Sequence, residues 1–438
     1  MQTACNPDRL FQICNADDLR ISVADFGVVG SGVVELFYKN KAHIEEKAGQ
    51  EMDVKYILDI RQFPASPYKD KIVASIDPIL EDSEVTAIAE CMGGVEPAFT
   101  YVKACLERGK SVSTSNKELV AQKGAELLAL AAEKNCNFFF EASVGGAIPI
   151  IRPLHKCLAA NDISGVAGIL NGTTNFILTK MIRDKMQFAD ALALAQKLGY
   201  AEKDPTADVE GLDACRKICI ISSLVFGKHV YPKDVYTKGI ADIALEDVEL
   251  AGHLGGAVKL IASVQRQADG RILPAVMPMF VSYDNLISRV DDVFNAIMVY
   301  GDAIDKTMFY GRGAGKFPTA SAVLGDVIDA VKHARTVFSQ AWEPSDDNSF
   351  LAPLAERTSR MYLKVSKCDP QQMFRKLYDF YASQKIAVDA QLSLARLKDG
   401  ENIAFLTPTE LTEAQCDMLV AQMTTGGIQV ISRMPVLN

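Results

Sequence analysis

The sequence predicts an α/β protein in three parts. Residues 1–150 alternate strand-like and helix-like segments, which predicts a Rossmann-type, doubly wound parallel sheet. Residues 151–342 contain longer apolar runs separated by helical segments, and they predict a central α+β domain. Residues 350–438 read strand, helix, strand, strand, helix, strand, which predicts a ferredoxin-like βαββαβ module. The polar stretch 343–348 is the expected linker.

The hydrophobic pattern sets the expected order of elements along the chain. In the first part, the expected strands cover 54–61, 111–114 and 136–146, with one within 21–29 that runs into a turn and one over 84–94 that ends in a double glycine. The expected helices cover 31–49 and 116–135, with one from 97 that stops before Gly109 in the segment 97–110. In the second part, 163–181 and 271–281 are expected strands. In the third part, strands are expected at 360–368, 387–397, 402–408 and 428–434, and helices at 370–386 and 413–427.

Composition excludes several classes of protein. The net charge of −9 and the pI of about 5.3 argue against a nucleic-acid partner, because no basic stripe is present. No apolar run reaches the length of a membrane span, and the first twenty residues lack the apolar region of a signal peptide. The ten cysteines form no CxxC pair, so free thiols and a cytoplasmic location are expected.

The stretch Gly199–Lys217 is the most informative part of the chain. It reads GYAEKDPTADVEGLDACRK and gathers five acids before Arg216 and Lys217. If the part after Gly211 is helical, Asp213 and Lys217 share one face because they are four positions apart. Carboxylates can hold an ammonium group and a lysine can transfer a proton, so the stretch suits an amino-acid zwitterion. The plainer alternative is a solvated acidic loop with an ion pair at the start of a helix.

A second motif lies between the first expected strand and helix. Residues 25–30 read DFGVVG, where a dinucleotide fingerprint belongs. Gly27 would let a pyrophosphate approach and Gly30 would allow close helix packing, but Asp25 stands in place of the first glycine. The alternative is an ordinary tight turn. Asp59 ends the next strand, where an acid takes the ribose hydroxyls of NAD, whereas Arg61 would meet the phosphate of NADP.

Four further turns carry polar or small residues. Asn116 and Lys117 in the turn 113–117 lie at a strand end, where they would face a ligand or else cap a helix. The turn 141–149 would offer carbonyl oxygens to a hard cation or serve as a hinge. The polar patch 171–175 is expected to face the site from between apolar strands, and the glycine-rich loop 311–316 to fold back against the cofactor.

These motifs, in this order, resemble homoserine dehydrogenase. The resemblance runs from about residue 21 to 335 through the blocks ECMGG, TSNK, EASVGGAIPII, GILNGTTNFIL, GYAEKDPTADVEGLDACRK and GRGAGKFPTASAV. It implies NAD(P)-dependent interconversion of L-aspartate 4-semialdehyde and L-homoserine, within threonine, methionine and isoleucine biosynthesis. The tail resembles an ACT domain, which implies an amino-acid effector such as threonine. The family resemblance also implies that the domain 151–342 binds substrate and mediates dimerisation, so a homodimer or homotetramer is expected. The chain is expected to return to the first domain near 311–335.

The resemblance also implies residue roles. Lys217 matches the proton donor, Lys117 the lysine between cofactor and substrate, and Asp213 a third catalytic group. The implied substrate-binding residues are Glu202, Asp208, Asp213, Lys117, Asn171, Thr173, Gly199 and Tyr200. The implied cofactor-binding residues are Phe26, Gly27, Val28, Val29, Gly30, Asp59, Arg61, Gly93, Ser113, Lys117 and Gly313. Glu141, Val144, Gly146 and Ile148 match a sodium site built mainly from backbone carbonyls.

Two residues and one turn depart from the family pattern. Asp25 replaces a glycine, Val28 stands where a threonine is common, and the tail turn 367–372 lacks the usual acid–Arg–Pro–Gly pattern. Two alternatives therefore accompany the main reading. One is a non-catalytic, amino-acid-binding regulatory homologue with an impaired cofactor site, and the other is a dehydrogenase for a different amino-acid semialdehyde.

Overall fold

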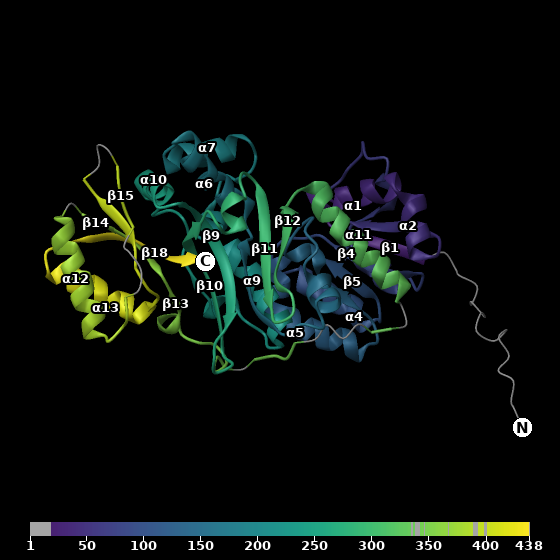
Figure 1. The fold of residues 1–438 in the computed structure, drawn as a ribbon. Helices are drawn as coiled ribbons and strands as arrows, with labels where there is room; N and C mark the ends of the chain where they lie inside the picture. The colour runs from purple at the N-terminus through teal and green to yellow at the C-terminus, as the bar shows by residue number, and fades with distance from the viewer. Residues whose placement is uncertain are drawn as a thin grey trace, which may run out of the picture. The chain divides into compact units, whose positions relative to one another are not determined.

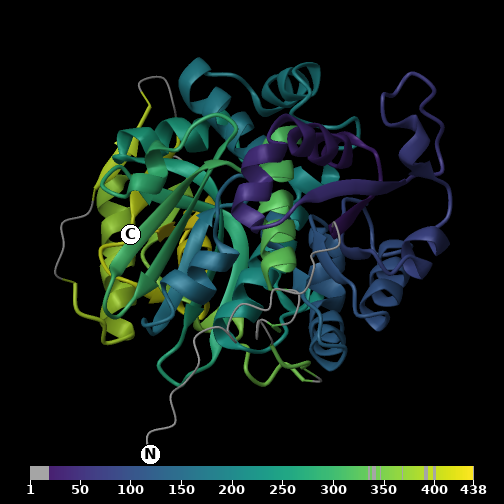
Figure 2. The ribbon, with the colours of Figure 1, turned by 90° about the vertical axis from the view of Figure 1, so that its right-hand side faces the viewer.

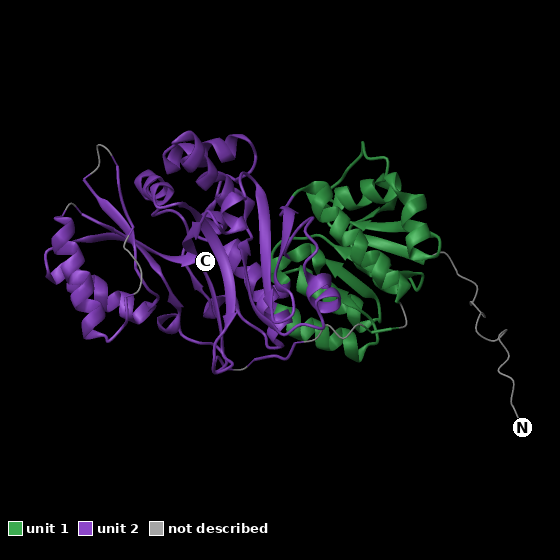
Figure 3. Ribbon diagram, in the orientation of Figure 1, with its two compact units in different colours: residues 1–119, 123–143, 315–340 green, residues 120–122, 144–314, 341–438 purple. Residues whose placement is uncertain are grey.

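The computed structural model describes residues 19–333, 336–337, 342–345, 347–366, 368–388, 393–397 and 401–437. Their contacts divide the chain into two compact units (Figure 3). Unit 1 comprises the described residues of 1–119, 123–143 and 315–340, and unit 2 those of 120–122, 144–314 and 341–438. Lys367 of the tail turn, Asp346 of the expected linker, Cys5 and Cys14 lie outside the described residues. Within the described part of the chain, no helix combines the length and apolarity needed to cross a bilayer.

Unit 1 is built on a six-stranded parallel sheet. Its strand order is β3-β2-β1-β4-β5-β6, which is the Rossmann order with a switch point between β1 and β4. The strands are β1 (Leu19–Ala24), β2 (Met52–Leu58), β3 (Ile72–Val73), β4 (Val85–Glu90), β5 (Ser111–Thr114) and β6 (Phe138–Phe139). The predicted doubly wound sheet is therefore confirmed.

The helices beside this sheet include one from much later in the chain. They are α1 (Val28–Lys39), α2 (Lys41–Ala48), α3 (Asp77–Glu81), α4 (Ala98–Glu107), α5 (Lys117–Glu133) and α11 (Lys316–Lys332). Helix α11 lies beside α1 (Figure 2). The two helices approach closely at Gly32, where a Cβ atom would lie 2.8 Å from Cγ of Lys316. Val323 and Val327 of α11 join the core that contains Val23 of β1.

Unit 2 contains one large mixed sheet. Its order is β12-β11-β7-β9-β10-β18-β14-β16-β15, and β8 pairs with β10. These strands are β7 (Ile163–Ile169), β8 (Tyr236–Thr237), β9 (Gly256–Arg266), β10 (Ile272–Ser282), β11 (Phe294–Gly301), β12 (Asp305–Arg312), β14 (Met361–Val365), β15 (Leu394–Arg396), β16 (Ile403–Leu406) and β18 (Val430–Leu437). A separate pair joins β13 (Thr358–Ser359) to β17 (Leu411–Thr412). The last strand, β18, joins the sheet of the tail to β10 by parallel pairing of Phe280 with Val436.

Unit 2 also contains α-helices. They are α6 (Gly172–Asp184), α7 (Phe188–Lys197), α8 (Thr206–Val209), α9 (Leu212–Phe226), α10 (Leu245–His253), α12 (Pro370–Ser383) and α13 (Glu413–Thr425). Short helical turns in the two units cover Lys69–Lys71, Glu141–Ser143, Pro153–Cys157, Pro232–Asp234, Leu286–Arg289 and Leu354–Glu356.

The tail has the predicted βαββαβ order. Its strands lie in the order β18-β14-β16-β15, all antiparallel, with α12 and α13 packed together against them (Figure 1). Alternate residues Met361, Leu363 and Val365 of β14 enter the core that α12 and α13 also line. This is the strand order of a ferredoxin-like module.

Two expected strands are wrong in part. Only Ile163–Ile169 of the expected strand 163–181 is extended, because the side chain of Asn171 accepts a hydrogen bond from the Thr174 amide and starts α6. The polar patch 171–175 thus lies at a strand–helix junction and not between two strands. Of the expected strand 136–146, only Phe138–Phe139 pairs, and a 3₁₀ turn follows.

Candidate functional site

The turn between β1 and α1 has an acid in a conformation that favours glycine. Asp25 has φ of 76°, and its Oδ2 accepts a hydrogen bond of 3.1 Å from the Gly27 amide. A Cβ atom on Gly30 would lie 1.8 Å from the Asp25 carbonyl oxygen, so only glycine permits this packing of α1. The turn therefore has the close packing of a dinucleotide fingerprint, with the Asp25 carboxylate folded over Gly27.

Arg61 binds both acids of this region. It donates to Asp59 from its amide at 2.8 Å, from Nε at 2.9 Å and from Nη2 at 2.6 Å, and Nη2 also donates to Asp25 at 2.9 Å. Asp59 accepts a further bond of 2.8 Å from the Phe26 amide. These bonds, led by Arg61, lower the pKa of Asp59 to about 2. Burial raises the pKa of Asp25, although Gly27 and Arg61 oppose that rise.

Several features of unit 1 fit a bound dinucleotide. Val28, at the start of α1, is 70% exposed, and a Cβ atom on Gly93 would have no heavy atom within 4 Å. Phe26 packs edge-on against Phe63, and Val29 packs against the same core as β1. The Asp25 carboxylate is less suitable for a bound dinucleotide. It accepts the hydrogen bond of the Gly27 amide, which a phosphate would otherwise accept, and its negative charge repels phosphate.

The turn after β5 supplies a cap and a lysine. Asn116 accepts a hydrogen bond of 3.0 Å from the Leu119 amide, so the capping alternative holds for Asn116. Lys117 is the first residue of α5 and is half-buried. The hydroxyl of Ser113 turns toward α11, where it contacts the Val323 carbonyl oxygen and the Asp326 carboxylate.

Sequence reasoning missed Glu90, the last residue of β4. It is 1% exposed, accepts a 2.6 Å bond from the Met92 amide and pairs with the Thr114 hydroxyl. That hydroxyl in turn accepts from the Asn116 amide at 2.9 Å. Burial raises the pKa of Glu90 to about 7, and the nearby Asp25 adds to that rise. An acid inside the otherwise apolar strand VTAIAE was the available signal.

In unit 2, the expected pair of Asp213 and Lys217 forms within a helix. Both lie on α9, and Nζ of Lys217 donates to Asp213 at 2.8 Å and to the Leu170 carbonyl oxygen at 2.8 Å. Lys217 is 6% exposed and Asp213 is 4% exposed. The predicted sharing of one helix face is confirmed, and the pair is buried rather than solvated.

Asn171 links this pair to a third acid. Its Nδ2 atom donates to Asp208 at 2.6 Å and to Asp213 at 2.9 Å. Burial raises the pKa of Asp208, while the bond from Asn171 opposes the rise. Thr173 donates to the Tyr200 carbonyl oxygen at 2.7 Å, which ties the start of α6 to the turn after α7.

The other expected substrate residues are more exposed. Tyr200 is 43% exposed and packs edge-on against Phe176. Gly199 has φ of 75° in the turn after α7, which explains a glycine there. Glu202 is exposed, outside the buried cluster, and its carbonyl oxygen accepts from Gln196.

The residues of the expected cation site are divided between the units. Glu141 belongs to unit 1, where it is buried and its amide donates to Asp326. Val144, Gly146 and Ile148 belong to unit 2. There the Ile148 amide donates to Gly145, and a Cβ atom on Gly146 would lie 2.5 Å from the Gly313 carbonyl oxygen. Across the described residues, no group of three or more His, Cys, Asp and Glu side chains suits a metal ion.

Gly313 belongs to unit 2, whereas the other expected cofactor residues belong to unit 1. A Cβ atom on Gly313 would lie 1.9 Å from Nδ2 of Asn295. Its role toward a cofactor stays a prediction.

Comparison with known families matches both units. Residues 26–141 match the model described as "Homoserine dehydrogenase, NAD binding domain", and residues 149–328 match the model described as "Homoserine dehydrogenase". The first match spans the turn at Gly27, and the second spans the buried Asp213–Lys217 pair.

Individual proteins agree with these matches. The homoserine dehydrogenase of Bacillus subtilis is 36% identical over 387 residues, which are 86% of this chain and 88% of that protein. That of Corynebacterium glutamicum is 37% identical, covering 84% of each chain. The crystal structure of a homoserine dehydrogenase from Thiobacillus denitrificans superposes with a TM-score of 0.84 at 32% identity, covering 96% of this chain and 99% of the other. With these relatives matched over most of its length, the chain belongs to the homoserine dehydrogenase family.

Proposed function

We propose that this protein interconverts L-aspartate 4-semialdehyde and L-homoserine with NAD(P), using Lys217 as the proton donor. The observation that carries the proposal is the buried contact of Lys217 with Asp213 at 2.8 Å. A buried ammonium group that donates a hydrogen bond to a carboxylate is held in a single orientation. Such a group stabilises the negative charge that develops on an aldehyde oxygen during reduction.

The proton steps follow from this arrangement. Bound NAD(P)H supplies the hydride that reduces the aldehyde carbon. Lys217 gives a proton to the aldehyde oxygen, which becomes the hydroxyl of homoserine, and solvent restores the proton. Asp213 and the Leu170 carbonyl oxygen hold Nζ in place. Lys117, at the start of α5, is proposed as a second cationic group toward the substrate.

The acids of unit 2 are proposed to bind the amino-acid end of the substrate. Asp208, held by Asn171, and the exposed Glu202 are suited to an ammonium group. Thr173, Gly199 and Tyr200 are proposed to shape the same region, which is supported by the bond between Thr173 and Tyr200.

The cofactor is proposed to bind along the β1–α1 turn, with Asp59 and Arg61 toward its ribose. A dinucleotide needs backbone amides and close approach there, and the start of α1 at Val28, Val29 and Gly30 supports this. The amides of Phe26 and Gly27 bond to Asp59 and Asp25, so a phosphate would have to compete with these two acids. Gly93, Ser113, Lys117 and Gly313 are proposed as further contacts. One structural neighbour, a hyperthermophilic archaeal homoserine dehydrogenase mutant, was solved in complex with NADPH, and it superposes with a TM-score of 0.60 at 28% identity.

Four further expectations are proposed with this function. A sodium ion is held by Val144, Gly146 and Ile148 through carbonyl oxygens, with Glu141. The tail is an ACT-like domain that binds an amino-acid effector such as threonine, and its βαββαβ order supports this. The protein forms a homodimer or homotetramer, and it acts in the cytoplasm.

The deciding experiment is a spectrophotometric assay. Purified protein is mixed with homoserine and either NAD or NADP at alkaline pH, and the absorbance of the reduced cofactor is followed. We expect turnover with at least one cofactor. If the protein binds homoserine but neither turns it over nor binds a cofactor, a regulatory homologue is favoured instead. If the protein turns over only a different amino-acid semialdehyde, it is a dehydrogenase for that other substrate.

A further inference from the structure

Besides Lys217, unit 2 buries Lys259 of β9, which is 0% exposed. Its Nζ atom donates to Oδ1 of Asn175 at 3.1 Å and to the Val290 carbonyl oxygen at 2.5 Å. A carboxylate oxygen of Asp291 lies 3.5 Å away. Burial lowers the pKa of Lys259 to about 8, although Asp291 opposes that fall. This ammonium group is thus held in the interior at a cost in solvation, and the reaction proposed above does not use it.

Hydrogen bonds connect Lys259 to the substrate cluster, which consists of Asn171, Asp208, Asp213 and Lys217. The Asn175 amide donates to the Asn171 carbonyl oxygen at 3.3 Å in the first turn of α6. We propose that Lys259 is a positioning residue for the proposed reaction. Through Asn175 it holds the start of α6 in the place from which Asn171 binds Asp208 and Asp213. The kinetic consequence rests on the proposed function, whereas the structural link does not.

The ammonium group of Lys259 determines how the Asn175 amide is oriented. An ammonium group only donates, so it directs Oδ1 of Asn175 toward β9. Nδ2 of Asn175 then faces the loop 290–294, where it donates to the carbonyl oxygens of Val290, Asp292 and Phe294 at 3.1, 3.0 and 3.1 Å. An apolar group in place of Lys259 would remove that donor from a buried oxygen, so the Asn175 amide would lose its fixed orientation and weaken these bonds.

The loop 290–294 in turn packs on two turns of α6. A Cβ atom on Gly172, the first residue of α6, would lie 2.8 Å from the Val293 carbonyl oxygen. Farther along α6, the Thr179 hydroxyl donates to the Asn175 carbonyl oxygen at 2.7 Å and accepts from the Asp292 amide at 3.0 Å. Because this packing leaves no free space at Gly172, a shift of the loop displaces the start of α6 and, with it, the adjoining Asn171.

The alternative is a lysine that only fills the core of unit 2. Arg183 already pairs with Asp291, so Lys259 is not needed to neutralise that acid. A methionine of similar length would fill the same space without the cost of burying a charge. What a methionine could not supply is donation to Asn175 and Val290, and these two bonds favour the positioning role.

Steady-state kinetics on Lys259→Met separates the two roles. We expect the KM for homoserine to rise about tenfold or more, because Asp208 is proposed to bind the substrate ammonium group. We expect kcat to change by less than about threefold, because Asp213 and the Leu170 carbonyl oxygen still hold Lys217. A packing role would only lower the folded fraction, which reduces the apparent kcat and leaves KM unchanged, and that result would overturn the proposal.

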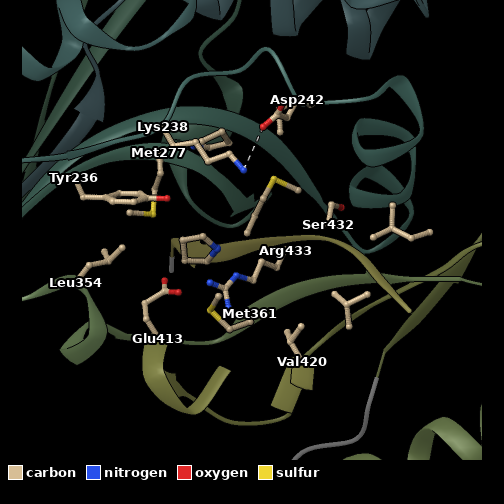
Figure 4. A pocket seen from close by; sticks show the side chains of 16 residues that line it. Tyr236, Lys238, Asp242, Met277, Leu354, Met361, Glu413, Val420, Ser432 and Arg433 are labelled. Atoms are coloured by element: carbon tan, nitrogen blue, oxygen red, sulfur yellow. Dashed lines mark ion pairs between the residues drawn. The ribbon is translucent and has the colours of Figure 1, made fainter. Parts of the chain in front are cut away.

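Lys364→Met is the matched control. Lys364 of β14 is 3% exposed and pairs with Asp247 at 2.9 Å. The same strand carries Met361, which lines a cavity of about 450 Å³ that none of the expected substrate-binding residues lines (Figure 4). The control therefore removes a buried ammonium group outside the substrate cluster, and it should lower the melting temperature without changing the KM for homoserine. An equal rise of KM in both variants would reflect the loss of any buried charge and contradict the proposal.

A double-mutant cycle tests whether Lys259 acts through Asn171. Asn171→Ser removes the donor that Asp208 and Asp213 share. When Asn171→Ser is already present, Lys259→Met should raise KM by less than about twofold, because the group that it positions is gone. Fully additive effects would rule out this route. Asn175→Ala breaks the same link from the side of α6 and carries the same tests if Lys259→Met does not fold.

A crystal structure of Lys259→Met, or of Asn175→Ala, gives a readout that does not depend on activity. Nδ2 of Asn171 should lie more than about 3.5 Å from the Asp208 carboxylate, beyond hydrogen-bond distance. An unchanged contact of 2.6 Å would overturn the positioning role even in an active enzyme. A displaced Asn171 in a protein whose parent does not turn over homoserine would overturn the proposed function and leave the link from Lys259 to Asn171 intact.

Discussion

Arg61 donates a hydrogen bond of 2.9 Å to Asp25 while it also holds Asp59 by its side chain and its amide. One guanidinium therefore serves two carboxylates at the edge of the expected cofactor site. The charges of these three side chains sum to −1, so a cofactor phosphate would approach a negative region. The one cation among the three, Arg61, is already paired with both acids. Displacing Arg61 toward a phosphate would leave both acids uncompensated.

Asp25→Gly should therefore tighten cofactor binding. The change removes a carboxylate next to the Gly27 amide and relieves a non-glycine residue at φ of 76°. With solvent screening, we expect a gain of about 1 kcal/mol, or roughly fivefold in Kd. Added salt should tighten binding in the parent more than in the variant, because only the parent carries the repulsion.

Fluorescence titration with NAD and NADP at two salt concentrations measures this effect. Asp25→Asn is the informative companion, since asparagine tolerates the left-handed region and lacks the charge. Both variants should improve affinity if charge is the cause. If both variants bind the cofactor as tightly as the parent or more weakly, Asp25 is a turn residue that the cofactor site tolerates.

Lys217→Ala should reduce turnover at least about a hundredfold, the usual scale for a positioned acid–base group. Cofactor affinity should be unchanged, because Lys217 bonds to Asp213 and the Leu170 carbonyl oxygen and lies far in sequence from the fingerprint turn. The change leaves Asp213 buried without its ammonium partner, so a loss of about 3 kcal/mol in stability is also expected. Steady-state kinetics is combined with a thermal melt, and exposed Lys197→Ala serves as the control. A folded variant with near-parental turnover would show that another group supplies the proton.

Glu90 should make unfolding free energy depend on pH. Its folded pKa of about 7 lies above the ordinary value of 4.5 for a glutamate, because burial disfavours the charged carboxylate. The folded state therefore holds more protons than the unfolded state between these values, and stability falls as pH rises through that window. The fall would be roughly 3 kcal/mol between pH 4.5 and pH 8.

Glu90→Gln should remove that component. Glutamine can still accept from the Met92 amide and reach Thr114, so the contacts of the loop persist. Urea unfolding at pH 5 and pH 8 gives the comparison, with exposed Glu84→Gln as the control. The idea fails if parent and Glu90→Gln show parallel pH dependence.

Asn171→Asp should separate capping from charge balance in the substrate cluster. Aspartate can still accept from the Thr174 amide and cap α6, but it replaces the donor that Asp208 and Asp213 share by a third acid. We expect kcat/KM for homoserine to fall by about tenfold or more, since like charges at this separation repel. Asn171→Ser is the neutral capping control and should lose less. Equal losses in the two variants would point to packing rather than charge.

The sequence by itself determined the local chemistry of this protein. Alternation of apolar segments predicted the parallel sheet of unit 1, because buried parallel strands and their crossover helices have distinct periodicities. The spacing of Asp213 and Lys217 predicted their pairing, because residues four apart share a helix face. The close turn at Gly30 was also predictable, since only glycine fits where backbone approaches backbone.

Tertiary structure alone decided which of these groups are desolvated and which partners they meet. Arg61 could have faced a cofactor, but contacts from two different strand ends direct it to Asp25 and Asp59. The local signal for Glu90 was an acid in the strand VTAIAE, but its burial among neighbouring strands depends on tertiary packing. The pairing of β18 with β10 depends on strands far apart in the sequence. Such contacts arise from long-range packing, which local periodicity does not specify.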